Sequence, residues 1–369
     1  MKVLMAGGGT AGHINPGLAI ANYLKQKHPD AQIKFVGTER GLETRLVTRE
    51  GYELELIKVR GFKRKLSFDT IIAIKELFQG MVEARKIIKI YKPDIVIGTG
   101  GYVCGPVLFN AAMMKIPTLI HEQNAYPGVT NKILSRYADA VAISFKESEK
   151  YFKSAKKIAL TGNPVRDEIL HTDKVSARKR LGISSNSRVV VVVGGSRGAQ
   201  NINNSVVDML KKYYNSNDFN IIFATGEAQY DRTMESLGKD IAPTVEVVPY
   251  IYNAADVYAA ADLMVCRAGA ITLSELTAMG IPAILIPSPF VTANHQEYNA
   301  RSLEKNGAAV VILEKELSGN VLYNQIMSLL KNREQLSRMA SNSKKMGITN
   351  ATEKIYSMIR EVMKQKGKH

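Results

Sequence analysis

Three short apolar segments of this 369-residue chain each run into a cluster of glycines and then into a segment of helical character. The glycine-rich junctions are Gly7–Gly12, Gly98–Gly101 and Gly194–Gly198. Glycine between a strand and a helix lets the backbone approach a ligand closely, and the first amides of the helix attract phosphate. Two junctions lie in the first half of the chain and one lies in the second. The pattern predicts two nucleotide-binding-like halves and ligands rich in phosphate.

Short β-branched runs alternate with helical stretches along the whole chain, which is typical of parallel βαβ units. The expected strands are 2–6, 32–37, 94–98, 117–121, 138–142 and 157–161, then 188–193, 219–224, 244–248, 262–266, 283–287 and 308–312. A turn-rich break over 161–166 separates the two series. Because the chain is too long for one ordinary core, we expect α/β domains over 1–163 and 164–349. A basic helix over 350–369, with its apolar side chains on one side, is expected to follow.

The chain carries 50 Lys and Arg against 34 Asp and Glu, and the excess is uneven. Residues 1–163 hold 25 basic and 14 acidic side chains, and the stretch 58–92 alone holds ten and three. Such a charge favours an anionic partner, which can be nucleic acid, an acidic membrane surface or a diphosphate substrate. No apolar run reaches the roughly 18 to 20 residues of a membrane span, and no signal peptide precedes the first strand. We therefore expect a cytoplasmic protein.

The basic stretch contains a candidate membrane-facing helix. The loop Gly61–Lys65 precedes the apolar residues Ile71, Ile72, Ile74, Leu77, Phe78 and Met81, which are interleaved with Lys75, Arg85, Lys86 and Lys89. One interpretation is an amphipathic helix whose apolar side faces the core. The other is that its leading end and the basic loop lie on anionic lipid.

The first glycine cluster also matches a dinucleotide-binding pattern. Gly7, Gly9 and Gly12 satisfy G-x-G-x-x-G, and Glu39 follows the second expected strand, where such folds keep a ribose-binding acid. An NAD-dependent dehydrogenase is therefore one hypothesis, and a non-enzymatic binder of acidic lipid or nucleic acid is another. His13 directly after the glycines, and separate nucleotide-like machinery in the second half, count against the dehydrogenase. The two cysteines, Cys104 and Cys266, lie far apart, so we expect free buried thiols.

The second half carries a constellation suited to a nucleotide. After the strand Leu263–Cys266, small residues open a helix, and Glu275 follows one turn in. A carboxylate there can accept both hydroxyls of a ribose while turn amides face a diphosphate, although a plain capping carboxylate is the alternative. The polar segment Asn294–Ala300 is suited to sugar hydroxyls or to a solvated helix start.

Seven segments together resemble one family. They are GGTAGH at 8–13, GTGGYVCGP at 98–106, HEQNAYPG at 121–128, GNPVR at 162–166, GGSRGAQ at 194–200, RAGAITLSE at 267–275 and HQEYNA at 295–300. This set, in this order, resembles the MurG family of glycosyltransferases, which convert lipid I to lipid II in peptidoglycan synthesis. The resemblance implies a GT-B fold, in which two Rossmann-like parallel-sheet domains face each other across a cleft. It also implies that the helix over 350–369 packs back on the N-terminal domain.

The resemblance further implies substrates and a location. The donor would be UDP-N-acetylglucosamine, bound by 164–349. The acceptor would be lipid I, undecaprenyl-diphospho-N-acetylmuramoyl-pentapeptide, bound by 1–163. A lipid-linked acceptor places the chain on the cytoplasmic face of the bacterial cell membrane, as a peripheral protein on anionic lipid beside other cell-wall synthesis proteins. Nucleic acid is not an expected partner.

Site residues carry over from the family one by one. Arg166 and Ser196 would face the donor diphosphate, and Ile251 would hold the uracil. Diphosphate and ribose would be bound by Ala270, Ile271, Thr272, Leu273, Ser274 and Glu275, with Glu275 on the ribose. Gln296 would bind the sugar hydroxyls, and Thr10, Ala11, Gly12 and Asn124 would line the donor sugar. Gly100, Gly101 and Tyr102 would receive the acceptor diphosphate. Ala11 replaces a glycine common in the family, which makes a positive φ at that position doubtful.

The family inverts the configuration at the anomeric carbon of the transferred sugar. This reaction requires a general base for the attacking hydroxyl and stabilisation of the departing UDP. The sequence contains no D-x-D triplet, so we predict no catalytic metal and no cofactor. His13 is the first candidate base, because imidazole changes protonation near neutral pH; its alternative is a helix cap or a ligand of the acceptor diphosphate. Glu122 is the second candidate base, and its alternative is a buried structural carboxylate. His121 is expected to be structural.

Overall fold

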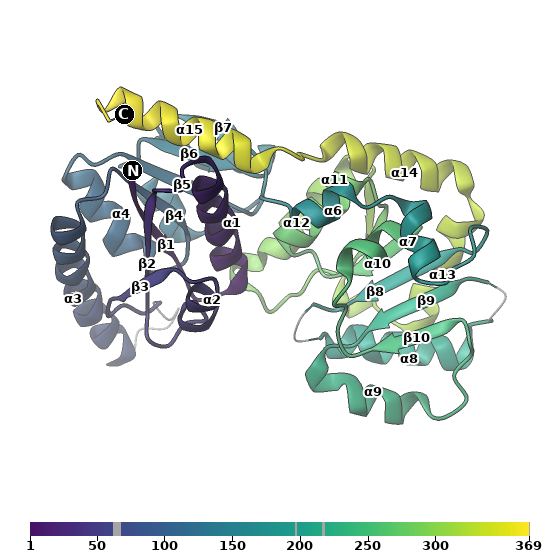
Figure 1. The fold of residues 1–369 in the computed structure, drawn as a ribbon. Coiled ribbons are helices and arrows are strands. Elements are labelled where there is room, and N and C mark those ends of the chain that lie inside the picture. The colour runs from purple at the N-terminus through teal and green to yellow at the C-terminus, as the bar shows by residue number, and fades with distance from the viewer. Residues whose placement is uncertain (62–67, 196–197, 216–217, 369) are drawn as a thin grey trace. The chain divides into compact units, whose positions relative to one another are not determined.

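The computed structural model describes residues 1–61, 68–195, 198–215 and 218–368 (Figure 1). The chain divides into two compact units. Unit 1 comprises Met1–Pro164 together with Asn350–His369, and unit 2 comprises Val165–Thr349. Among the described residues, no helix combines the length and the apolar character that crossing a bilayer requires.

Unit 1 is built on a parallel sheet with the order β3-β2-β1-β4-β5-β6-β7. Its strands are β1 (Lys2–Gly7), β2 (Gln32–Gly37), β3 (Glu53–Leu56), β4 (Ile95–Gly100), β5 (Thr118–Glu122), β6 (Ala140–Ile143) and β7 (Ile158–Leu160). Strand order reverses between β1 and β4, and open α/β sheets bind ligands beyond the carboxyl ends of the strands at such a switch point. The β1 and β4 glycines therefore lie where this fold places a site.

Helices cover both faces of this sheet, as its apolar strands require. They are α1 (Ala11–Lys27), α2 (Glu43–Arg49), α3 (Phe68–Tyr91), α4 (Cys104–Met113), α5 (Val129–Leu134) and the 3-10 helix η1 (Lys146–Tyr151), with α15 (Ala351–Gln365) from the end of the chain. Alternate strand residues point to opposite faces. Val3 and Ile97 join one apolar cluster with α1 and α15, whereas Leu4 and Val96 join a second cluster with α3 and α4.

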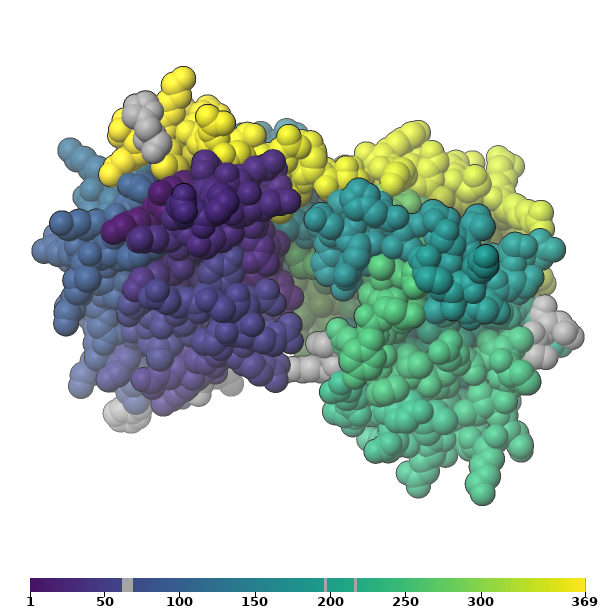
Figure 2. Space-filling view, viewed as in Figure 1, coloured from purple at the N-terminus to yellow at the C-terminus, as the bar shows by residue number. Residues whose placement is uncertain are grey.

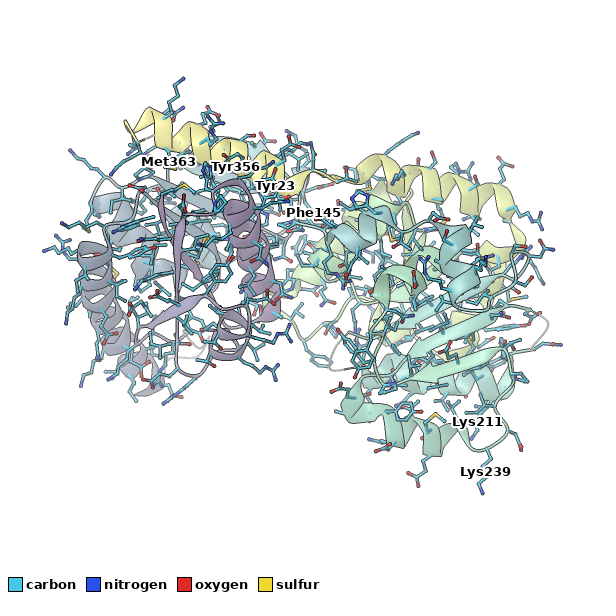
Figure 3. The ribbon with its side chains drawn as sticks, viewed as in Figure 1. Tyr23, Phe145, Lys211, Lys239, Tyr356 and Met363 are labelled. Atoms are coloured by element: carbon cyan, nitrogen blue, oxygen red, sulfur yellow. The ribbon has the colours of Figure 1, made fainter. Side chains whose placement is uncertain are left out.

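The C-terminal helix α15 packs on unit 1. Its apolar side chains, Ile355, Met358, Ile359, Val362 and Met363, are at most 5% exposed and belong to the same apolar cluster as α1. The ring centroids of Tyr23 and Tyr356 lie 5.8 Å apart, and the hydroxyl of Tyr356 lies 2.7 Å from Nε2 of His28. Figure 2 shows the yellow C-terminal segment against the purple N-terminal one, and Figure 3 labels Tyr23, Tyr356 and Met363 at this contact.

Unit 2 repeats the architecture, with the parallel order β10-β9-β8-β11-β12-β13. Its strands are β8 (Val189–Val193), β9 (Asn220–Ala224), β10 (Val245–Val248), β11 (Leu263–Cys266), β12 (Ala283–Leu285) and β13 (Ala309–Val311). Its helices are α6 (Asp167–His171), α7 (Lys174–Arg180), α8 (Gln200–Lys212), α9 (Tyr230–Leu237), α10 (Ala254–Ala260), α11 (Ala270–Met279), α12 (His295–Lys305), α13 (Gly319–Lys331) and α14 (Arg333–Met346), with the 3-10 helices η2 (Glu227–Gln229), η3 (Thr292–Asn294) and η4 (Glu314–Glu316). The switch point lies between β8 and β11.

The expected α/β class with two parallel sheets is confirmed, and one strand was missed. Among the described residues, β3 lies at the edge of its sheet and pairs with β2 alone; its sequence, Glu-Leu-Glu-Leu, is short and half charged. Edge strands tolerate such charge because one side of their backbone faces solvent, and this weakens the sequence signal. The expectation of free buried thiols is correct for both cysteines, and burial raises the pKa of Cys104 and of Cys266 to about 12.

Candidate functional site

The carboxyl ends of β1 and β4 converge on His13 in unit 1. His13 lies in the first turn of α1, whose first residue is Ala11 and whose N-cap is Thr10. Ala11 is not among the residues with positive φ, in agreement with the sequence expectation. The amide of Gly8 donates to the carbonyl of Gly100 over 3.2 Å, which joins the β1 turn to the end of β4.

The hydrogen bonds of His13 define its tautomer. Nδ1 lies 3.1 Å from the carbonyl oxygen of Gly8 and 3.3 Å from Oγ1 of Thr10. A carbonyl oxygen only accepts hydrogen bonds, so the proton of the neutral ring resides on Nδ1. Nε2 then carries the lone pair, and within the described residues it has no hydrogen-bond partner. The ring is therefore arranged to take a proton at Nε2.

The first two glycine junctions lie in contact with each other. Gly101 has a φ of +87°, and a Cβ on it would lie 2.4 Å from the carbonyl oxygen of Gly8. Only glycine permits this approach between the two turns. Tyr102 is half-buried, and its ring lies beside Gly9. Residues assigned from the sequence to the donor sugar, to the acceptor diphosphate and to catalysis are thus neighbours at the carboxyl ends of β1 and β4 in unit 1.

Glu122 ends β5 and is 1% exposed. Its Oε1 accepts from the amide and the side-chain nitrogen of Asn124, at 3.0 and 3.2 Å. Its Oε2 accepts from the amide of Gly128 at 3.1 Å and from Nδ2 of Asn131 at 2.8 Å. Both oxygens are already hydrogen-bonded inside the protein, so the geometry favours the structural carboxylate over the second candidate base. The two hydrogen bonds to Oε1 also fix the position of Asn124.

His121 is fully buried and hydrogen-bonded at both nitrogens. Nε2 lies 3.1 Å from the carbonyl oxygen of Gly162, and Nδ1 lies 3.0 Å from Nε2 of Gln123. Burial lowers the pKa of His121 to about 4, and the contact with Gly162 opposes this shift. The ring is therefore neutral at physiological pH, as its expected structural role requires.

A buried carboxylate that the sequence reasoning overlooked lies beneath the first glycine turn. Glu43, the first residue of α2, is 0% exposed and accepts from the amide and the hydroxyl of Thr38, both at 2.9 Å. It also accepts from the amide of Gly9 at 3.2 Å. A turn amide that binds this carboxylate is not available to a dinucleotide phosphate, which counts further against the dehydrogenase hypothesis. Glu39, considered for the ribose in that hypothesis, is exposed.

The residues assigned to the donor nucleotide and described by the structure lie at the carboxyl ends of the strands of unit 2. Ile251 follows β10 and is half-buried, and α11 starts at Ala270, directly after the β11 turn. The first turn of α11 contains no acidic residue, and its N-cap residue, Gly269, has no side chain to cap the helix. The amides of a helix start arranged in this way attract an anion. Ser196, assigned to the diphosphate, lies outside the described residues.

Glu275 and Arg166 form an ion pair that the sequence did not reveal. Nε of Arg166 donates to Oε1 of Glu275 over 2.9 Å, and NH1 donates to Glu168 over 3.1 Å. Glu275 is 5% exposed. Burial raises the pKa of Glu275, whereas the charge and the hydrogen bond of Arg166 oppose that rise. The residues assigned separately to ribose and to diphosphate are therefore in contact.

Two further contacts shape this edge of unit 2. Gln296 is half-buried in the first turn of α12, and its Oε1 accepts from the amide of Ser288 at 2.9 Å. Arg267 donates to the carbonyl of Ile286 at 3.1 Å and to Glu314 at 2.6 Å. The nearly buried Arg267–Glu314 pair holds the turn before α11 in place. Sequence reasoning missed this pair because its partners are far apart along the chain.

Helix α3 carries apolar side chains on its outer face. Its core side is formed by Ala73, Ala84 and Ile88. The exposed side carries Ile71, Ile72, Ile74, Phe78, Val82 and Ile90, with Phe78 69% and Val82 70% exposed. Lys75, Arg85, Lys86 and Lys89 are also exposed. Leu77 packs against the apolar core of unit 1, so α3 has a core side as well as the exposed apolar side that the lipid interpretation requires. The basic residues Lys63, Arg64 and Lys65 lie outside the described residues.

Over the described ranges, no group of three or more His, Cys, Asp or Glu side chains is arranged to hold a metal ion. The prediction of metal-free chemistry remains a prediction, and its test is given below.

Comparison with known proteins identifies the family. Two doubly wound parallel-sheet units, which match a solved structure of this architecture along almost the whole chain, place the protein in the GT-B fold class. The N-terminal domain of glycosyltransferase family 28 matches residues 3–143, and the C-terminal domain of that family matches residues 189–355. The chain belongs to glycosyltransferase family 28.

Full-length relatives carry one name. A protein of Acetivibrio thermocellus is 64% identical over 366 residues, 99% of each chain, and one of Ruminiclostridium cellulolyticum is 60% identical over 365 residues, 98% of this chain and 100% of its own. Both are named UDP-N-acetylglucosamine--N-acetylmuramyl-(pentapeptide) pyrophosphoryl-undecaprenol N-acetylglucosamine transferase. The crystal structure of Acinetobacter baumannii MurG is similar, with a TM-score of 0.80 and 32% identity over 98% of this chain and 99% of that one.

Proposed function

We propose that this chain transfers N-acetylglucosamine from UDP-N-acetylglucosamine to the 4-hydroxyl of the N-acetylmuramic acid of lipid I, forming lipid II. The observation that carries the proposal is the end-to-end similarity to relatives named for this transfer. The linkage formed would be β-1,4, with inversion of configuration at the anomeric carbon of the donor sugar.

Unit 2 would bind the donor. The start of α11 would receive the diphosphate, and Ile251 would hold the uracil. Glu275, whose ionised form is favoured by Arg166 at 2.9 Å, would accept the ribose hydroxyls, since an ionised carboxylate is the stronger acceptor. Gln296 would bind the sugar hydroxyls.

Unit 1 would supply the base and the acceptor site. Nε2 of His13 would take the proton from the attacking hydroxyl, because Nδ1 already donates to the carbonyl of Gly8. The acceptor diphosphate would lie at Gly100, Gly101 and Tyr102. Thr10, Ala11, Gly12 and Asn124 would line the donor sugar. The negative charge on the departing UDP would be stabilised by helix-start amides and Arg166.

The lipid acceptor requires contact with a membrane. The exposed apolar residues of α3, beside Lys75, Arg85, Lys86 and Lys89, would bind an anionic bilayer surface from the cytoplasmic side. This makes the chain a peripheral membrane protein.

The test is a transfer assay with a panel of UDP-sugars and a soluble lipid I analogue. We expect saturable turnover with UDP-N-acetylglucosamine and unchanged turnover in EDTA. Calorimetric binding of NADH without binding of any UDP-sugar would reject the proposal. Loss of turnover in EDTA would reject metal-free chemistry alone.

A further inference from the structure

Two hydrogen bonds meet on a single peptide unit beneath His13. The Gly8–Gly9 peptide accepts at its carbonyl oxygen from Nδ1 of His13, 3.1 Å away. The amide of the same peptide donates to Oε2 of Glu43, 3.2 Å away. The peptide is trans, so its C=O and N–H point in opposite directions. The peptide therefore links the imidazole on one side to the carboxylate on the other.

We propose that Glu43 is a positioning residue for His13 and acts through the Gly8–Gly9 peptide, an inference that rests on His13 being the base of the proposed function. Negative charge at the amide end polarises the peptide and makes the Gly8 carbonyl a stronger acceptor. The stronger acceptor holds the proton on Nδ1 and fixes the orientation of the ring. In the neutral ring the lone pair then lies on Nε2, which has no hydrogen-bond partner among the described residues.

The surroundings of Glu43 are built to hold a carboxylate. Oε1 accepts two hydrogen bonds from Thr38, and Oε2 accepts the amide of Gly9. A Cβ would lie 2.8 Å from Oε1 if placed on Gly8, 2.4 Å from Cγ on Gly37 and 1.9 Å from Oε2 on Gly41. Three glycines therefore leave the space that this buried side chain fills. Burying a carboxylate is costly, and an apolar side chain would fill the same space at lower cost.

A purely structural role for Glu43 is the competing explanation. In that case the carboxylate stabilises only the segment between β2 and α2, through its hydrogen bonds with Thr38. The charge of Glu43 then has no effect on the tautomer of His13. Asp139 offers a matched control, because its Oδ2 accepts from the amide and the hydroxyl of Thr118, both at 3.1 Å. It lies at the amino ends of the strands, whereas His13 lies at their carboxyl ends. Asp139 has no link to His13.

The experiment measures the tautomer of His13 by ¹⁵N NMR of the full chain, with the His13→Gln spectrum for assignment. Wild type, Glu43→Gln and Asp139→Asn are compared, and kcat and KM are measured for each with UDP-N-acetylglucosamine and a soluble acceptor. We expect the Nδ1–H form in wild type and in Asp139→Asn. In Glu43→Gln we expect a mixture of tautomers and a kcat lower by about tenfold or more, with KM within about twofold.

The outcomes separate this inference from the proposed function. A wild-type ring in the Nε2–H form overturns the inference even if Glu43→Gln fails to fold. A folded Glu43→Gln with wild-type tautomer and kcat also overturns it. If no variant and no wild-type sample transfers the sugar, the proposed function fails, and the NMR comparison still decides whether Glu43 sets the state of His13.

Discussion

The imidazole of His13 lies against the backbone of Gly100. A Cβ on Gly100 would come within 2.7 Å of Cδ2 and 3.1 Å of Nε2 of the ring. Gly100 also has a φ of +110°, a conformation that L side chains rarely adopt. One glycine therefore ends β4 in an unusual conformation and leaves the space in which the candidate base lies.

Gly100→Ala is expected to displace this ring. The added methyl group would lower kcat by about tenfold or more, because small misplacements of a catalytic group are costly. Backbone strain would reduce the free energy of unfolding by about 1–3 kcal/mol. The control is Gly51→Ala, which has a φ of +80° and open space around the new Cβ. It should lose similar stability, measured by denaturant unfolding, and keep its kcat; equal kcat in both variants would contradict the crowding argument.

His13→Ala and Glu122→Gln distinguish the two candidate bases. Loss of a general base lowers kcat by about 10²–10⁴-fold, and we expect this for His13→Ala with donor affinity retained. Glu122→Gln turns an acceptor toward the donors of Gly128 and Asn131 into a competing donor, so it should mainly reduce stability. Steady-state kinetics and thermal unfolding give both quantities. If Glu122→Gln instead loses kcat while folded, and His13→Ala does not, the assignment of the base is reversed.

Glu275→Gln should weaken binding of UDP-N-acetylglucosamine by about tenfold or more, since hydrogen bonds to a charged acceptor are worth about 1.5–3 kcal/mol. The matched control is Glu168→Gln, because Glu168 also pairs with Arg166 but its side chain is 63% exposed. Its removal should leave the affinity, measured by calorimetry, within about twofold. A comparable loss in both variants would mean that Arg166, rather than Glu275, binds the nucleotide.

The pH dependence of donor binding should also show the effect of Arg166 on Glu275. Burial raises the pKa of Glu275 and Arg166 opposes the rise. In Arg166→Gln the pKa of Glu275 should therefore rise further, and the protonated form would appear at higher pH than in wild type. Donor affinity of Arg166→Gln, measured as a function of pH, should begin to fall at a higher pH on acidification. A pH dependence identical to that of wild type would show that the pair does not control the carboxyl group.

His121 should make the protein acid-sensitive. Its pKa is lowered to about 4 in the folded state from an ordinary 6.5, so the unfolded chain binds more protons between these values. The stabilising contribution is fully present above pH 6.5 and is lost as the pH falls toward 4, by about 3 kcal/mol. Urea unfolding across this range should show a shallower loss for His121→Gln than for wild type. His171→Gln, at an exposed position on α6, should match wild type.

The outer face of α3 should control membrane binding. Phe78→Ser combined with Val82→Ser removes two side chains that are 69% and 70% exposed, so folding should be little affected. Binding to vesicles with anionic lipid, measured by sedimentation, should weaken by about tenfold or more because apolar burial in the interface is lost. Val175→Ser on α7, 78% exposed, is the control. Equal losses in both variants would exclude α3 as the contact surface.

Much of the fold follows from local patterns. The two series of apolar runs, the break near Thr161–Arg166 and the apolar face of the final helix were all apparent along the chain. Strand β3 was not apparent from the sequence, because its alternating glutamates and leucines do not form the apolar run that marks a buried strand. The candidate residues were found through glycine turns and family motifs, whereas Glu43 stands in no recognisable motif and the partner of Arg267, Glu314, lies 47 positions further along the chain.

The sequence by itself determined the α/β class, the two parallel sheets and the glycine turns, because strand periodicity and backbone freedom are properties of neighbouring residues. Only the tertiary structure decided which distant groups meet. It joined the first two glycine turns at His13 and Gly100, brought Glu43 to Gly9 across 34 positions and paired Arg166 with Glu275 across 109. These contacts depend on strand order and burial, which put residues far apart in the chain within hydrogen-bond distance at one edge of a sheet.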